Sequence, residues 1–151
     1  MKAYAGIDPG NSGAIAFLLS DDLPRVYDWP GDASAAAEIV KDLHSECRVQ
    51  LAALEKVHSM PKQGISSTFK FGVNFGIWQG ILAMIGWPHL MPRPQEWQKG
   101  LVSKTDGPDP KSRSLAVARR LFPDVDLSKK KHDGRADALL LAWWAKQQGQ
   151  K

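Results

Sequence analysis

The sequence contains little cysteine and no cluster of histidines. Cys47 is its only cysteine, which excludes an internal disulfide. The four histidines, His44, His58, His89 and His132, are too scattered for a metal site of the zinc-finger type. Both absences fit a chain that folds in a reducing compartment, so we expect a cytoplasmic protein.

Long apolar runs are also missing. No run approaches the roughly 18 residues of a membrane span, and the first residues, MKAYAGIDPG, lack the pattern of a signal peptide. We therefore expect no membrane partner. With 151 residues, 43% of them hydrophobic and 24% charged, the chain can bury a core, and we predict one globular domain over residues 1–151.

Positive charge is sparse in the first part of the chain and concentrated in the second. The formal net charge is −2 over residues 1–90 and +6 over residues 91–151. Basic clusters stand at Lys111/Arg113, Arg119/Arg120 and Lys129–Lys131. Such clustering is typical of a surface that binds a polyanion, although an ordinary solvated surface explains the charge alone equally well.

Hydrophobic patterning predicts three strands, then a helix, then alternating strands and helices. The predicted strands are residues 2–8, 13–19, 25–29, 49–55 and 89–91, and the predicted helices are residues 33–46, 68–86, 94–101, 110–122 and 133–148. Polar loops are expected at residues 58–67 and 103–109. A meander followed by mixed units implies an α/β fold with a mixed sheet and helices on its faces.

Acidic residues stand where two of these strands end. Asp8 and Glu55 each close a predicted apolar strand, and functional sites in such sheets form at the carboxyl ends of strands. Asp133 and Asp137 are four residues apart, so a helix places both on one face. Leu140 lies close to that face, which therefore points inward. These positions predict a cluster of acids at one edge of the sheet.

Crowded carboxylates raise one another's pKa, so a site that keeps several of them ionised needs cations. Oxygen ligands suit Mg²⁺ or Mn²⁺, and two such ions can support an in-line displacement at phosphorus. Each acid taken singly also has a structural explanation: Asp8 as a turn residue, Glu55 as a surface charge and Asp133 as a helix N-cap. The acids taken together favour a metal site.

Three segments resemble the acidic motifs of RuvC-type Holliday junction resolvases, in the ribonuclease H-like superfamily: GIDPGNSGAIA (6–16), LEKVH (54–58) and DGRADALLLA (133–142). The segments NFGIWQGILAMIG, PRPQEWQK and KSRSLAVARRLFP resemble that family's central helix, the strand and short helix after it, and its basic penultimate helix. The resemblance spans nearly the whole chain. The compact loops are similar to phage or prophage versions, which would act in the cytoplasm of a bacterial host.

The resemblance implies a ribonuclease H-like mixed five-stranded sheet flanked by helices. It further implies a homodimeric, metal-dependent endodeoxyribonuclease that acts in DNA recombination and repair. Such an enzyme would use two divalent ions, Mg²⁺ or Mn²⁺, to resolve four-way DNA junctions by paired symmetric nicks. Branched DNA would be its partner.

The resemblance also implies roles for the acids. Asp8, Glu55 and Asp137 match the family's metal-binding and catalytic acids. The family usually has its other C-terminal acid, or a histidine, three residues before the last one, and this chain has Gly134 there. We favour Asp133 as the fourth ligand because it shares a helix face with Asp137, and His132 is the open alternative.

Basic and aromatic residues are expected to hold the DNA. Lys111 would neutralise charge on the cleaved phosphate. Family members often carry an aromatic residue three positions after the second acid, where this chain has His58. Phe69 and Phe71 are alternatives for that role, but their pattern favours the core of a helix. The other expected DNA contacts are Lys62, Lys70, Lys104, Arg113, Lys129, Lys130 and Lys131.

Other functions remain open from the sequence. One is a different ribonuclease H-like nuclease that acts on flaps, branched DNA or RNA–DNA hybrids. Another is a branched-DNA-binding module without catalysis. GIDPGNSG also resembles the phosphate loop of actin-like ATPases and sugar kinases, but 151 residues leave little room for the second domain of those proteins.

The apolar surface of the predicted helix 68–86 is compatible with a homodimer or with burial inside one domain. The predicted helix 68–86 carries Phe75, Trp78, Leu82 and Ile85 around more than one face. A second copy of the chain could cover the surplus, or the helix could be buried within its own domain.

Overall fold

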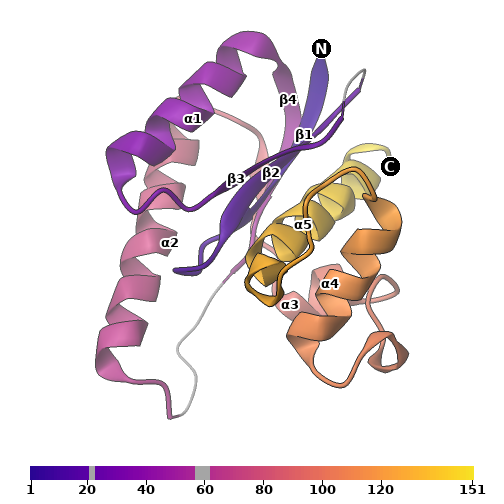
Figure 1. Cartoon of the computed structure of the whole chain (residues 1–151). Helices are drawn as coiled ribbons and strands as arrows, with labels where there is room; N and C mark the ends of the chain where they lie inside the picture. Colours follow the sequence, from indigo (N-terminus) through magenta and orange to yellow (C-terminus); the bar gives the residue numbers. More distant parts are fainter. Residues whose placement is uncertain (21–22, 57–61) are drawn as a thin grey trace.

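A five-stranded mixed sheet lies at the centre of the computed structural model, which describes residues 1–20, 23–56 and 62–151 (Figure 1). Its strands are β1 (Lys2–Asp8), β2 (Ala14–Leu19), β3 (Arg25–Asp28), β4 (Arg48–Leu54) and β5 (His89–Leu90), in the order β3-β2-β1-β4-β5. The first three strands pair antiparallel, whereas β4 runs parallel to both β1 and β5. The predicted mixed sheet is confirmed.

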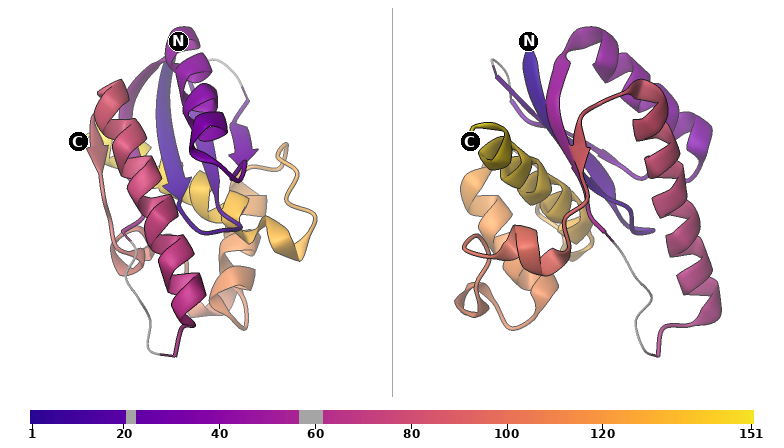
Figure 2. Two further views of the ribbon diagram at one scale, coloured as in Figure 1. Left: turned by 90° about the vertical axis from the view of Figure 1, so that its left-hand side faces the viewer. Right: turned by 180° about the vertical axis from the view of Figure 1, so that it is seen from behind.

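Helices cover both faces of this sheet (Figures 1 and 2). One face carries α1 (Ala33–Glu46) and α2 (Ile65–Ile85). The other face carries α3 (Pro94–Gln98), α4 (Pro110–Leu121) and α5 (Asp133–Gly149), with short 3₁₀ turns at η1 (Lys104–Asp106) and η2 (Lys130–His132). This arrangement matches the predicted α/β fold with flanking helices.

Alternation along β1 decides which side chains face α5. Ala3, Ala5 and Ile7 point into the core beneath α1 and α2. Gly6 points the other way, and a Cβ at this position would lie 2.1 Å from the carbonyl oxygen of Ala138 in α5. The helix therefore rests directly on the backbone of β1. Asp8, two residues after Gly6, projects from the same face toward α5.

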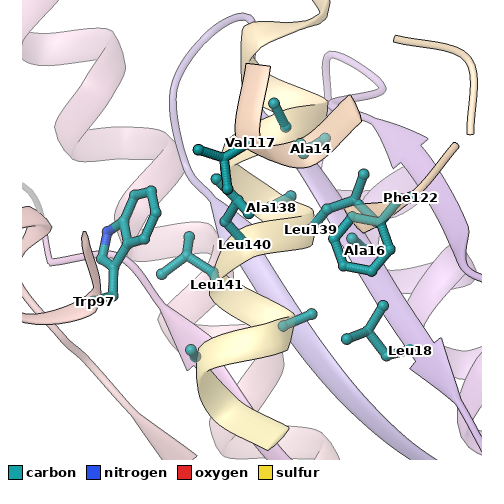
Figure 3. Close-up of a cluster of buried hydrophobic side chains, with 14 of the residues drawn as sticks. Ala14, Ala16, Leu18, Trp97, Val117, Phe122, Ala138, Leu139, Leu140 and Leu141 are labelled. Atoms are coloured by element: carbon teal, nitrogen blue, oxygen red, sulfur yellow. The ribbon is translucent and has the colours of Figure 1, made fainter. Parts of the chain in front are cut away.

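The apolar middle of α5 anchors it to the sheet. Leu139, Leu140 and Leu141 are fully buried. They share one core cluster with Trp97 of α3 and Val117 of α4 (Figure 3). Packing of this density fixes the helix, and with it the acids of its first turns.

The structure corrects two predictions about α2. The helix begins at Ile65, inside the predicted polar loop, rather than at residue 68. The Thr68 hydroxyl donates to the carbonyl of Gly64, so small polar residues form its first turn. Phe69 is 72% exposed, so its assignment to the core was wrong.

The second predicted polar loop, residues 103–109, contains the turn η1.

Within residues 1–20, 23–56 and 62–151, no helix combines the length and the apolarity that crossing a bilayer requires.

Candidate active site

Asp8 occupies a tightly folded turn at the end of β1. Its Oδ1 accepts a hydrogen bond of 2.9 Å from the backbone N–H of Gly10, and the N–H of Gly13 donates to the carbonyl of Gly10 over the same distance. A Cβ on Gly13 would lie only 2.0 Å from the Asp8 carbonyl oxygen, so this fold-back requires glycine. The turn holds the Asp8 carboxylate at the sheet edge.

Glu55 lies beside Asp8 because β4 runs parallel to β1. The Glu55 N–H donates to the carbonyl of Ile7, 3.0 Å away, which continues the ladder one residue beyond β4. The indole Nε1 of Trp97 donates to Glu55 Oε1 at 3.0 Å. Backbone and side chain are both held, so the parallel register brings the two strand-end acids together as the sequence predicted.

Asp137 approaches these two acids from α5, one turn into the helix. The hydroxyl of Ser114, a buried residue of α4, hydrogen-bonds to its carboxyl group. Asp137 Oδ1 is buried and has no hydrogen-bond partner within the residues that the structure describes. A buried acceptor left unpaired is costly, and a cation would satisfy it.

Burial and repulsion from neighbouring carboxylates raise the pKa of all three carboxyl groups. Burial is the largest cause in each case; it raises the pKa of Asp8 to about 6 and, with repulsion from Asp8, that of Glu55 to about 7. The pKa of Asp137 rises well above its usual value through burial and repulsion from Asp8. Only a nearby positive charge would keep all three ionised at neutral pH.

The acids do not already form a compact ligand set. Among the described residues, no three His, Cys, Asp or Glu side chains are close enough together to be a ready metal-binding group. The unpaired oxygen of Asp137 and the mutual repulsion of the acids nevertheless fit a divalent cation with oxygen ligands. Asp8, Glu55 and Asp137 are the residues that would hold it.

The raised pKa values predict that the metal-free protein loses stability as pH rises from about 4 to about 7. The folded state binds more protons than the unfolded state in this window, so deprotonation favours unfolding. Asp137→Asn removes one of these carboxylates, and at pH 8 in EDTA it should raise Tm by about 2–8 °C. Differential scanning calorimetry measures this change. Asp42→Asn, at an exposed position of α1, is the control, and a lower Tm for Asp137→Asn would contradict the predicted repulsion.

Asp133 lies close to Asp8, to Asp137 and to a lysine. Its Oδ2 is 3.5 Å from Nζ of Lys111, and it contributes to the raised pKa of Asp8 and of Asp137. Lys111, at the start of α4, lowers the pKa of Asp8. The helix α5 begins at Asp133, and the cap position belongs to His132, so the N-cap interpretation of Asp133 does not describe this structure.

Gly134 fills the position where the resemblance leads one to expect an acid. A Cβ there would lie 1.9 Å from the carbonyl oxygen of Ser12, in the turn after Asp8. No side chain fits between α5 and this turn. The departure from the family pattern therefore has a steric cause, and it leaves Asp133 as the nearest acid.

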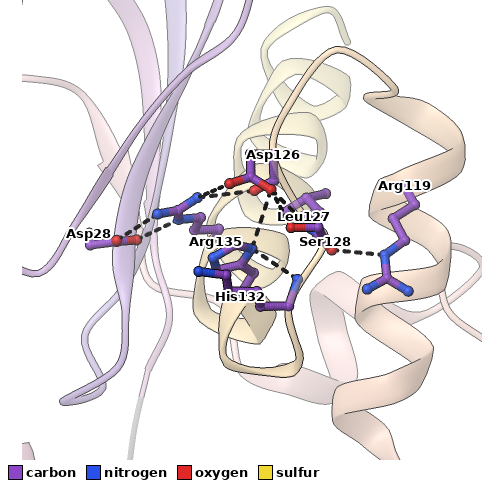
Figure 4. A network of polar contacts seen from close by, with 8 residues as sticks. Asp28, Arg119, Asp126, Leu127, Ser128, His132 and Arg135 are labelled. Atoms are coloured by element: carbon purple, nitrogen blue, oxygen red, sulfur yellow. Dashed lines mark hydrogen bonds and ion pairs between the residues drawn. The ribbon is translucent and has the colours of Figure 1, made fainter.

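His132 belongs to a separate polar network (Figure 4). Its ring is 4% exposed, and its Nδ1 accepts a hydrogen bond from the N–H of Lys129 and lies 3.8 Å from Asp126 Oδ1. In the same network the Arg135 guanidinium donates two hydrogen bonds to Asp28. Burial and Arg135 lower the pKa of His132. The structure thus surrounds this ring with Asp126 and Arg135 rather than with the three acids.

The expected DNA contacts lie in several places. Six lysines are exposed: Lys62, Lys70, Lys104, Lys129, Lys130 and Lys131. Arg113 differs, because its guanidinium donates to the carbonyls of Gly107 and Pro108 in its own loop. His58 lies outside the described residues.

Sequence reasoning missed three polar residues around the acids. Ser114 could have been noticed as a hydroxyl on the apolar face of α4. Nothing in the sequence pairs Trp97 with Glu55. Asn74 of α2 donates a hydrogen bond of 3.0 Å to Asn11, which ties the turn after Asp8 to the opposite helix layer.

Comparisons with known proteins place this geometry among known folds. A structure of Thermus thermophilus RuvC in complex with a Holliday junction substrate superposes with a TM-score of 0.66, over 95% of this chain and 92% of that one, at 17% identity. A second Thermus thermophilus RuvC structure gives 0.59 over 97% and 96%, at 18% identity. The chain has the RuvC fold. The predicted ribonuclease H-like architecture is thereby confirmed.

Sequence comparison identifies a protein that is similar to part of this chain. Over 88 residues, 57% of this chain, the sequence is 37% identical to the chloroplastic Holliday junction resolvase MOC1 of Chlamydomonas reinhardtii. The match covers 10% of that much longer protein. No protein-family model matches the chain.

Proposed function

We propose that this protein is a divalent-metal-dependent endonuclease that resolves four-way DNA junctions by paired nicks. The observation that carries the proposal is the meeting of Asp8, Glu55 and Asp137 at one edge of a RuvC fold, with Asp137 Oδ1 buried and unpaired within the described residues. Resemblance to resolvases in fold and in sequence supports the junction as substrate.

The side chains would have different roles in such a reaction. Asp8, Glu55 and Asp137 would hold two Mg²⁺ or Mn²⁺ ions, with Asp133 beside them. When bound, the ions supply the activation of water and the neutralisation of phosphate charge. Lys111, 3.5 Å from Asp133 and close enough to lower the pKa of Asp8, would sit against the phosphate. The exposed lysines would contact the phosphates of the DNA backbone without reading the base sequence.

A panel of labelled DNA substrates tests this function. The wild-type protein in Mg²⁺ should nick a four-way junction symmetrically and faster than a three-way junction, a flap, an RNA–DNA hybrid or a linear duplex. Preference for the flap or the hybrid would show another ribonuclease H-like nuclease. Tight junction binding without any nicking, in either Mg²⁺ or Mn²⁺, would show a binding module and overturn the enzymatic proposal.

The fourth ligand can be tested by two substitutions. Asp133→Asn should reduce junction cleavage about 10–100-fold, because Asp133 lies close enough to Asp8 and Asp137 to raise the pKa of both. His132→Ala should leave the rate of cleavage per folded molecule nearly unchanged, since its ring lies in the network of Asp126 and Arg135. Single-turnover rates and circular dichroism measure both effects. Loss of cleavage in the histidine variant alone would reverse the assignment.

We also propose that two copies associate through α2. Several large apolar side chains of this helix are exposed, including Ile65, Phe69 and Met84. A groove of about 560 Å³ between α1 and α2 is lined by Gly76, Gly80 and Met84 among others. Exposed apolar surface of this extent is typical of an interface. Sedimentation of a monomer at micromolar concentration would count against the dimer.

A further inference from the structure

Trp97 makes a contact that core packing does not require. Its ring is fully buried among the apolar side chains beneath α5 (Figure 3). Its Nε1, however, donates to Oε1 of Glu55 at 3.0 Å. A buried indole N–H needs an acceptor, and here the acceptor is an acid of the active site rather than a backbone carbonyl.

The backbone fixes the donor and the acceptor relative to each other. The N–H of Lys56, directly after Glu55, donates to the carbonyl of Pro92 over 2.8 Å. Two residues later α3 begins, and its first turn is closed by a 2.7 Å hydrogen bond from the Arg93 N–H to Glu96 Oε2. The chain between β5 and Trp97 is therefore attached to the residue next to Glu55, so the indole has little freedom to move away.

The hydrogen bond from the Trp97 indole can fix the orientation of the Glu55 carboxylate. An indole has a single N–H and no acceptor, so it can engage only one of the two carboxylate oxygens. Repulsion from Asp8 favours rotation of the Glu55 carboxylate away from the acids. A hydrogen bond to Oε1 opposes that rotation and leaves Oε2 for a cation. Partners of metal-binding carboxylates generally act in this way.

We propose that Trp97 is a positioning residue that orients Glu55 for metal binding through its indole N–H. This inference rests on the proposed function, since it gives Glu55 the role of a metal ligand. It goes further because it assigns part of the metal affinity to a side chain that would touch neither the metal nor the DNA.

The experiment compares Trp97→Phe with a matched control. Phenylalanine keeps an aromatic ring and removes the N–H. Trp87→Phe is the control, because the Trp87 Nε1 donates to His44 Nδ1 at 2.9 Å in the core on the opposite face of the sheet. Mn²⁺ affinity is measured by electron paramagnetic resonance without DNA. Junction affinity is measured by a binding titration in EDTA, and Tm is measured by calorimetry.

Trp97→Phe should weaken Mn²⁺ binding about tenfold or more, with junction affinity in EDTA unchanged. Trp87→Phe should lower Tm comparably and leave Mn²⁺ affinity at the wild-type value. Equal Mn²⁺ affinity in wild type and Trp97→Phe would overturn the proposal. Failure of the function proposed above is a separate result: the wild-type protein would then cut no junction, yet the difference in Mn²⁺ affinity between the variants would remain.

A second measurement does not require Trp97→Phe to fold. In wild-type protein labelled with ¹⁵N-tryptophan, Mg²⁺ should shift one indole N–H signal strongly, and Glu55→Gln should shift the same signal. The signal lost in Trp87→Phe identifies Trp87, and Mg²⁺ should leave it in place. If no indole signal responds to both Mg²⁺ and Glu55→Gln, Trp97 does not position Glu55.

Discussion

Replacing Asp8 with asparagine should abolish cleavage of a four-way junction in Mg²⁺, by about a thousandfold or more, while the protein still binds the junction. Asparagine keeps an oxygen that can accept from the Gly10 N–H, so the turn after β1 should survive. It removes the negative charge that a divalent ion requires at the end of the strand. Single-turnover cleavage and a binding titration in EDTA measure the two effects separately.

Asp42→Asn is the matched control for Asp8→Asn. Asp42 is exposed on α1, on the other face of the sheet, so the same chemical change there should leave the cleavage rate within about twofold of the wild-type rate. Full cleavage by Asp8→Asn in Mg²⁺ would refute the metal-binding role of Asp8. Loss of both cleavage and binding would instead indicate that the turn had unfolded.

Replacing Gly6 with valine should prevent stable folding. A Cβ at Gly6 would lie 2.1 Å from the carbonyl oxygen of Ala138 and 2.2 Å from the backbone nitrogen of Ala142. Both are backbone atoms of α5, which cannot move aside as a flexible side chain can. Displacing α5 would disrupt the core around Leu140, so we expect a destabilisation above about 4 kcal/mol. Urea unfolding followed by circular dichroism tests this expectation.

Gly72→Ala separates the steric effect from the loss of a glycine in general. Gly72 lies within α2, and apart from its two chain neighbours and the nearby backbone of its own helix, no described atom comes within 4 Å of a Cβ built there. Alanine also favours a helix by about 1 kcal/mol over glycine, so this variant should be as stable as the wild type or more so. A folded Gly6→Val protein with the wild-type midpoint would show that α5 does not rest on β1 as described.

The regular elements were predictable because their apolar residues follow one period over long stretches. Residues 33–46 show this best, where predicted and observed helices coincide. The start of α2 was missed because Ser66 and Ser67 read as loop residues, although the first turn of a helix accepts such side chains readily. Local composition could not reveal that turn.

The acids at the strand ends were predictable for a topological reason. Asp8 ends β1 and Glu55 follows β4, and these two strands run parallel, so their carboxyl ends lie at the same edge of the sheet. Trp97 and Ser114 could not be assigned to the site in this way, because each contacts its acid from another helix. Such contacts depend on the packing of α3 and α4, which no local pattern encodes.

The close approach of Gly134 to Ser12 links two segments that are far apart in the chain. The turn that excludes a side chain at position 134 is also the turn that holds Asp8. A side chain could be accommodated at position 134 only if this turn changed shape, and the same turn positions the Asp8 carboxylate. The order in which mutations could occur is therefore restricted, and homologues of this chain should show covariation between the turn and the first residues of α5.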